Sequence, residues 1–131
     1  MVTTLEEALY SRLSGFAALT NLVGLRIYPL EAPQDSPRPH VVYTRDITET
    51  ISAFGSDTGN VKVVMEISAW ATTYDSALAI CKQIKAALQR WSGTYDSVVI
   101  QDTFIDTEFQ DFESDTAGVR VSQNYIIWFK V

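Results

Sequence analysis

Hydrophobic residues recur at helical spacing near the start of the chain. Thr4 can cap a helix, and Glu7 completes a capping box three residues later. Gly15 is placed to end this helix in a left-handed cap, and residues 16–22 predict a further turn or two closed by Gly24. The apolar face of the first helix consists of Leu5, Ala8, Leu9 and Leu13.

A second amphipathic helix is predicted after residue 72. Thr72 or Thr73 can cap its start, and Gly93 is expected to mark its end. The side of this helix that is expected to face solvent carries lysine and arginine toward its C-terminal half, where positive charge interacts favourably with the helix dipole. Its apolar stripe is Ala77, Ile80, Cys81, Ile84, Leu88 and Trp91.

Extended segments account for most of the remaining chain. In residues 61–71, a set made of Val61, Val63, Met65, Ile67 and Ala69 alternates with one that includes Lys62, Glu66 and Ser68, which predicts a strand. Residues 26–28, 40–48, 97–112 and 119–131 also read as strands, with a turn at 114–118. Three of the four prolines lie in residues 31–39, which predicts an ordered loop.

Residues 49–60 are rich in serine, threonine, aspartate and glycine. This composition predicts an exposed, mobile loop between two strands. Hairpin loops usually have about 2–5 residues, so a loop of this length suggests a function.

This order of elements predicts a single α+β domain over residues 1–131. The expected architecture is a two-layer sandwich, with a mainly antiparallel sheet of about four strands and two helices packed on one face. Trp70 and Trp128 fall on the strand faces opposite the main apolar sets, and Ile126 joins them there. Strands that are apolar on both sides are usually covered on both sides, so we expect the second face to pack on a neighbouring subunit.

The composition fits a folded, acidic domain. Hydrophobic residues make up 47% of the chain and charged residues 20%, and the formal net charge is −6. Such a chain is a poor match for avid binding to nucleic-acid phosphates. One cysteine excludes an internal disulfide, and the sequence shows no signal peptide and no apolar run long enough to span a membrane.

Candidate catalytic and metal-binding residues are few. The single histidine, His40, has no nucleophile or carboxylate placed beside it, and Cys81 lies on an apolar helix stripe. These two residues do not have metal-ligand spacing, and the glycines form no phosphate loop. We therefore expect no cofactor, no metal and no enzyme activity.

Acidic residues concentrate near the C-terminus. Residues 96–131 hold seven acids and two bases. A calcium loop is a poor fit because Thr116 stands where a sharp-turn glycine is needed. Two interpretations stay open, a solvated acidic hairpin and a negative surface that lines a passage for DNA. A hydrolase using Asp102 and Asp106 is a third, weaker one.

Several short stretches, taken in order, resemble a known protein family. The first runs from Phe16 to Gly24 and is followed by Arg26-Ile27-Tyr28-Pro29. Ala32-Pro33-Gln34 and the stretch from Pro37 to Tyr43 come next, and Val61 to Ala71 then leads into Thr73-Tyr74-Asp75-Ser76-Ala77. This succession resembles the tail-completion, or tail-to-head joining (tail terminator), family of long-tailed bacteriophages.

The resemblance implies a structural virion protein that is assembled in the host cytoplasm. Proteins of this kind form a ring, typically six-fold, at the head-proximal end of the tail tube. The implied partners are the tail tube protein and a neck or head-completion protein. DNA would pass through the ring without specific binding, and no membrane would be involved.

Two sets of residues are the candidates for these contacts. The intersubunit set is Thr50, Ile51, Ser52, Ala53, Phe54, Gly55, Trp70 and Trp128, and residues up to Gly59 belong to the same loop. The set for the lumen or for docking is Asp102, Asp106, Glu108, Asp111, Glu113 and Asp115. Alternatives are another head-tail connector such as a head-completion protein, a small acidic hydrolase, or a monomeric binding module that uses the Trp70 and Trp128 face.

Overall fold

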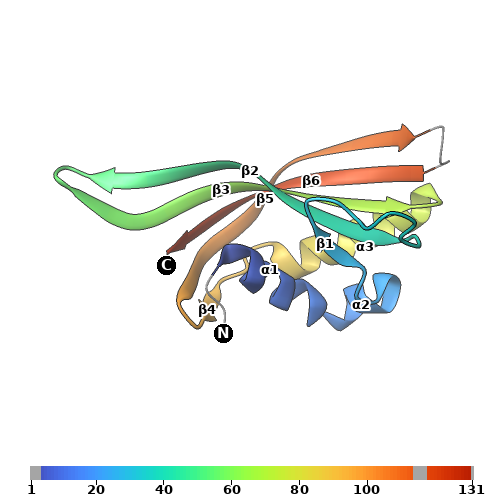
Figure 1. The fold of residues 1–131 in the computed structure, drawn as a ribbon, viewed down its shortest axis with the longest axis horizontal. Helices are drawn as coiled ribbons and strands as arrows, with labels where there is room; N and C mark the ends of the chain where they lie inside the picture. Colours follow the sequence, from blue (N-terminus) through green and yellow to red (C-terminus); the bar gives the residue numbers. More distant parts are fainter. Residues whose placement is uncertain (1–3, 114–117, 131) are drawn as a thin grey trace.

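A computed structural model describes residues 4–113 and 118–130, which form three helices and six strands (Figure 1). The helices are α1 (Leu5–Ser14), α2 (Ala17–Val23) and α3 (Tyr74–Leu88). The strands are β1 (Ile27–Pro29), β2 (His40–Ala53), β3 (Ser56–Ala71), β4 (Gly93–Tyr95), β5 (Val98–Glu113) and β6 (Gly118–Lys130). They form one sheet in the order β1-β2-β3-β6-β5-β4.

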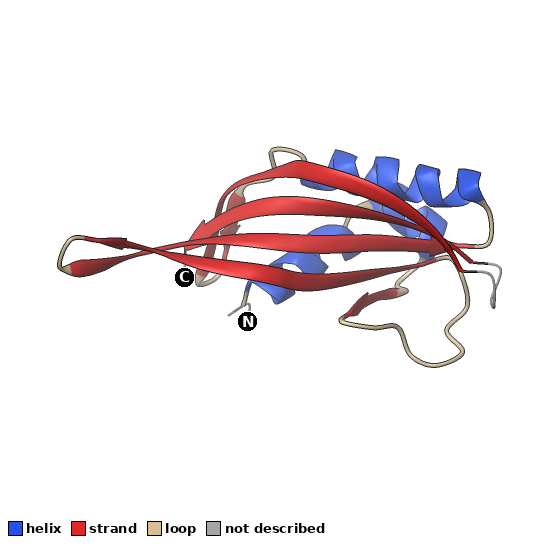
Figure 2. Cartoon of the chain, turned by 90° about the horizontal axis from the view of Figure 1, so that it is seen from above, coloured by secondary structure: helices blue, strands red, loops and turns tan. Residues whose placement is uncertain are grey.

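The expected fold class is wrong in sheet size, strand direction and number of helices. The described residues form a mixed sheet of six strands, in which β1 runs parallel to β2, together with three helices. The sheet is long and curled rather than a flat layer (Figure 2). Of the two short edge strands, β1 overlaps the strand predicted at residues 26–28, whereas β4 was not predicted because three residues are too few for an alternating pattern.

Strands β3 and β6 form the centre of the sheet and divide its two faces. Met65 pairs with Tyr125 and Val63 with Ile127, and all four side chains are fully buried. The helices pack on this side of the sheet, where Leu9 of α1 and Ile84 of α3 are also fully buried (Figure 1). This helix-covered side is the core.

The other side of the sheet, here called the open face, has no helix on it among the described residues (Figure 1). Its central positions pair across β3 and β6. They are Lys62 with Trp128, Val64 with Ile126, Glu66 with Asn124, Ser68 with Ser122, and Trp70 with Arg120.

Hydrogen bonds at the helix starts confirm the predicted caps. The Thr4 side chain accepts a hydrogen bond from the Glu7 amide at 3.2 Å, and the Thr73 side chain accepts one from the Ser76 amide at 3.2 Å. The predicted helix ends are wrong in two places. Gly15 caps α1 in the right-handed region, and α3 ends at Leu88, so Gly93 begins β4 instead.

The loop predicted at residues 49–60 is also wrong, because β2 and β3 continue through it to a two-residue turn. Gly55 has φ 81°, a left-handed conformation that favours glycine in such a turn. Ile51 pairs with Asn60 and Ser52 with Asp57, so Thr58 and Gly59 form a bulge. This segment is rich in serine, threonine, aspartate and glycine, a composition typical of loops, so it carried no strand signal in the sequence.

This hairpin projects well beyond the rest of the molecule (Figures 1 and 2). Asn60 pairs with Lys130 of β6, and the described residues of β6 pair with no part of β3 beyond that point. We call residues 51–59 the arm. Its backbone is a two-stranded ribbon that packs against no helix.

The cap of α3 gives a stability prediction. Replacing Thr73 with Ala removes the hydrogen bond to the Ser76 amide, so the free energy of unfolding should fall by about 1 kcal/mol. Urea unfolding measures it. Thr72→Ala is the matched control, because Thr72 is exposed and lies just outside the helix. Equal losses in the two variants would contradict the assignment of Thr73 as the cap.

Candidate functional site: the open sheet face and the arm

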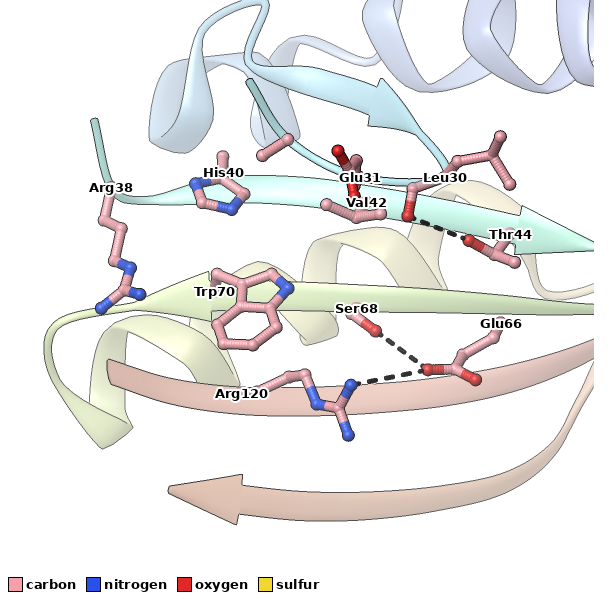
Figure 3. A pocket seen from close by; sticks show the side chains of 11 residues that line it. Leu30, Glu31, Arg38, His40, Val42, Thr44, Glu66, Ser68, Trp70 and Arg120 are labelled. Carbon is pink, nitrogen blue, oxygen red and sulfur yellow. Dashed lines mark hydrogen bonds and ion pairs between the residues drawn. The ribbon is translucent and has the colours of Figure 1, made fainter. Parts of the chain in front are cut away.

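A hollow of about 270 Å³ lies on the open face where the proline loop crosses it, and we call it the Trp70 hollow (Figure 3). Strands β2, β3 and β6 supply its floor, and the loop after β1 supplies its rim. Its charged and aromatic lining residues are Glu31, Arg38, His40, Glu66, Trp70 and Arg120.

Two arginines pack against the ring of Trp70. The guanidinium carbons of Arg38 and Arg120 lie 5.6 Å and 5.4 Å from the ring centroid. The Arg38 guanidinium also lies against Gly118, where any side chain would collide with it. Cation–π contacts of this kind contribute about 0.5–2 kcal/mol each and hold both arginines over the tryptophan.

Arg120 also links two carboxylates across the open face. It lies 4.0 Å from Glu66 on β3 and 3.5 Å from Asp111 on β5, and it packs over the ring of Phe109. Strand pairing brings these partners together, because β6 lies between β3 and β5. Arg120 therefore connects three strands on a face that has no second layer.

His40 forms the wall between the hollow and the proline loop. Its ring stacks with Trp70 at 6.3 Å and meets Tyr28 edge-on at 6.1 Å. Burial is the main reason that the pKa of His40 lies below its usual value, and the charges of Arg38 and Arg26 lower it further. A weak contact of 3.4 Å with the Pro37 carbonyl oxygen acts in the opposite direction. We find no nucleophile or carboxylate in contact with this ring among the described residues.

The rest of the open face is apolar and only partly covered. Trp128 packs under the Lys62 ammonium at 5.9 Å, and Phe104 under the Arg90 guanidinium at 5.3 Å. Ile47 of β2 is 57% exposed on the same face. The prediction that Trp70 and Trp128 lie opposite the core is confirmed, and both are half-buried.

The predicted acidic set does not form one continuous face. Asp102 pairs with the Arg90 guanidinium at 2.8 Å on the open face, whereas Glu108 accepts a hydrogen bond from Gln123 on the other face. Asp106 falls at a bulge in β5 and is exposed, and Asp111 pairs with Arg120. The side chain of Glu113 and all of Asp115 lie outside the described residues.

The predicted intersubunit residues fall on the arm and at its base. Thr50 is exposed on β2, and Gly55 forms the turn. Phe54 stands beside Gly55 at the tip and is fully exposed. The side chains of Ile51, Ser52 and Ala53 lie outside the description. Trp70 and Trp128 lie on the open face, which is a separate part of the surface.

Sequence reasoning missed Arg38 and Arg120, the residues that organise the Trp70 hollow. Neither stands in a recognisable motif. Their roles depend on the pairing of Trp70 with Arg120, and this register between β3 and β6 is not visible in a single sequence. The sequence offered no specific signal for Arg120, because the polar residues Ser122, Gln123 and Asn124 occur in the same strand.

The described residues offer no other reactive centre. No group of three or more His, Cys, Asp or Glu side chains that could hold a metal ion occurs among them. Burial raises the pKa of the Cys81 thiol to about 12, so it stays protonated at neutral pH. None of the helices within residues 4–113 and 118–130 has the length and apolar character needed to cross a membrane.

Comparison with known proteins decides the family. Residues 7–130 match the family described as tail completion protein gp17. The chain belongs to this family. It is therefore a tail-completion protein, a structural component of a tailed virion. The resemblance noted from the sequence is confirmed over nearly the whole chain.

Two solved structures share the fold of this tail-completion protein. A chain from the virion of a native gene transfer agent particle superposes with a TM-score of 0.77 at 16% identity, covering 97% of this chain and 95% of that one. The gp17 protein of bacteriophage SPP1 gives a TM-score of 0.53 at 20% identity, covering 97% and 88%. A search among curated proteins gave no significant match.

The environment of His40 predicts a pH dependence. Because the pKa of His40 is lower in the folded protein, the unfolded state binds more protons below pH 6.5. The free energy of unfolding therefore has its full value above pH 6.5 and decreases as pH falls below 6.5, because protonation of His40 then favours the unfolded state. Denaturant unfolding between pH 7.5 and 5 should show a larger loss for the wild type than for His40→Gln. An equal loss of stability in the wild type and in His40→Gln over this pH range would contradict the prediction.

Proposed function

We propose that copies of this tail-completion protein form a closed ring, six-fold in the assembled particle, at the head-proximal end of the tail tube. In this role the ring ends the tube, presents a docking surface to a neck or head-completion protein, and lets DNA pass through its centre. Membership of the family supports a place in the tail, and the projecting arm is the observation that supports a ring.

The arm has the properties of an element that contacts another molecule. An isolated two-stranded hairpin is marginally stable in water, and the arm receives no packing from the described body of its own chain. Phe54 at its tip is fully exposed, so a large apolar side chain is available there for a partner to cover. An arm that leaves one copy and meets the next produces a head-to-tail interface, and a ring results when the rotation closes.

The charge of the chain supports passage of DNA without binding. A net charge of −6 opposes close contact with phosphates. Arginines on the open face are held by carboxylates or aromatic rings, as Arg90 is by Asp102 and Arg120 by Asp111. These pairs leave less free positive charge to retain DNA.

A head-completion role is the alternative within the same class. The two roles predict different partners, because a tail-completion ring binds purified tail tubes and a head-completion protein binds filled capsids. Co-sedimentation with each separates them. The hydrolase alternative gains no support from the site, since the Asp102 carboxylate is bound by Arg90 and a bulge displaces Asp106 from regular pairing.

Loss of the gene should separate heads from tails. Electron microscopy of particles from a producer that lacks this gene should show filled heads beside unattached tails, with tails of irregular length. Adding the purified chain to the extract should restore joined particles. Complete, joined particles in the absence of the gene would contradict the proposal.

A shorter arm should block this rescue without unfolding the protein. Deleting the paired residues Ser52, Ala53, Ser56 and Asp57 brings the Phe54-Gly55 turn closer to the body and keeps the pairing below it. We expect at least about a tenfold loss of joined particles, as for removal of a central interface contact, with an unchanged circular dichroism spectrum. Full rescue by the shortened chain would show that the arm is dispensable.

A further inference from the structure

The two ends of the long sheet carry complementary features. The arm with Phe54 projects from one end, and the start of α3 and the far ends of β5 and β6 lie at the opposite end (Figures 1 and 2). Exposed aromatic residues gather at that far end, where Tyr74 is 49% exposed and Phe112 is 63% exposed. They line a hollow of about 370 Å³ together with Gln110, Asp111 and Val119, and we call it the Phe112 socket.

The socket has the chemistry of a pocket for one aromatic side chain. Two aromatic rings and one branched side chain form its walls. Tyr74 donates a hydrogen bond to the Gln110 side-chain oxygen at 3.0 Å, which fixes one wall. An inserted phenylalanine ring gains both burial of its own surface and ring-to-ring contacts.

The edge of β5 next to the socket has room for a neighbouring arm. The described part of β4 pairs only with Val98–Ile100, and the chain after α3 bonds the next part of the edge, where the Arg90 amide donates to the Thr103 carbonyl and the Ile105 amide donates to the Gln89 side-chain oxygen. Beyond Ile105, the outer side of β5 up to Phe112 has no strand partner among residues 4–113 and 118–130. An arm can lie along this edge with its tip at the socket.

The length of the arm limits how far it overlaps the neighbouring copy. Ile51 pairs with Asn60 at its base, and Phe54 lies three residues further along β2, or about 10 Å at strand spacing. With Phe54 in the socket, the arm therefore lies beside roughly the last three residues of β5 before Phe112.

We propose that Phe54 of one copy occupies the Phe112 socket of the next. This inference rests on the proposed ring and specifies its contact. The interface is heterologous, because the arm and the socket are different surfaces at opposite ends of one chain. The aromatic contact supplies most of the affinity.

A photo-crosslinker at the tip tests the contact in the assembled particle. Replacing Phe54 with p-benzoylphenylalanine keeps an aromatic ring there and allows capture by light. We expect a covalent dimer of this chain, with the second copy linked within residues 110–119 or at Tyr74. The arm cannot reach its own socket, so such a link joins two copies. The crosslinker at Tyr10, 37% exposed on α1, is the control and should not give this link.

Substitutions give a second, independent readout. Phe54→Ala and Phe112→Ala should each lower the yield of joined particles at least about tenfold, while Leu25→Ala, which removes another exposed apolar side chain, should not.

The outcomes separate this contact from the proposed function. If joined particles require the chain but the crosslink forms with the tail tube, with another part of this chain, or not at all, the socket contact is wrong and the ring function stands. Normal yields for both Phe54→Ala and Phe112→Ala would also overturn the contact. Joined particles without the gene would overturn the function itself.

Discussion

The structure depends on the pairing of β3 with β6, which commits one face of the sheet to the core. Met65, Tyr125 and their neighbours are fully buried under α1 and α3 because the register places them on the same side. A shift of one residue would turn this set toward solvent and carry Lys62 and Glu66 into the core. The same register brings Arg120 beside Trp70 and ends the pairing of β6 at Asn60. The open face and the arm are therefore consequences of how the core is built.

Arginine and lysine side chains cover the open face in place of a second layer. Arg38, Arg90, Arg120 and Lys62 each lie over an aromatic ring. Such contacts shield apolar surface while keeping charge in water, and they are weak enough to be exchanged for a partner. A face protected in this way can remain soluble before assembly and still offer Trp70, Trp128 and Ile47 to a neighbour. The arm and the open face are thus the two separate surfaces that we propose for contacts within a particle.

Local signals in the sequence were enough to predict the helices and the central strands. Thr4 and Thr73 cap helices as expected, and the alternation in residues 61–71 identified the buried face of β3. The family was also visible, because its short motifs keep their order along the chain. The arm could not be predicted, since its sequence has the composition of a loop. The full size of the sheet was missed in part because β4, with three residues, is defined by its pairing with β5 rather than by its own sequence.

The candidate site was predicted only in part, because the register between neighbouring strands decides which side chains meet, and a single sequence does not show that register. Trp70 and Trp128 were placed correctly because alternation within one strand determines the face. The acids of β5 were expected to act together, but bulges after Ile100 and Ile105 and pairing with Arg90 and Arg120 distribute them between faces and partners. Arg38 reaches Trp70 through the fold of the proline loop. Contacts between strands and loops that are far apart in the sequence cannot be predicted from a single amino-acid sequence.

A reconstruction of the head–tail junction by electron cryo-microscopy, from particles that contain this chain, tests the central claim most directly. The account predicts one closed ring of this fold between the tail tube and the neck, with each arm extending onto the adjacent copy and an open channel at the centre. A single copy at the junction, a ring whose arms all point away from neighbouring copies, or density for this chain elsewhere in the particle would contradict it.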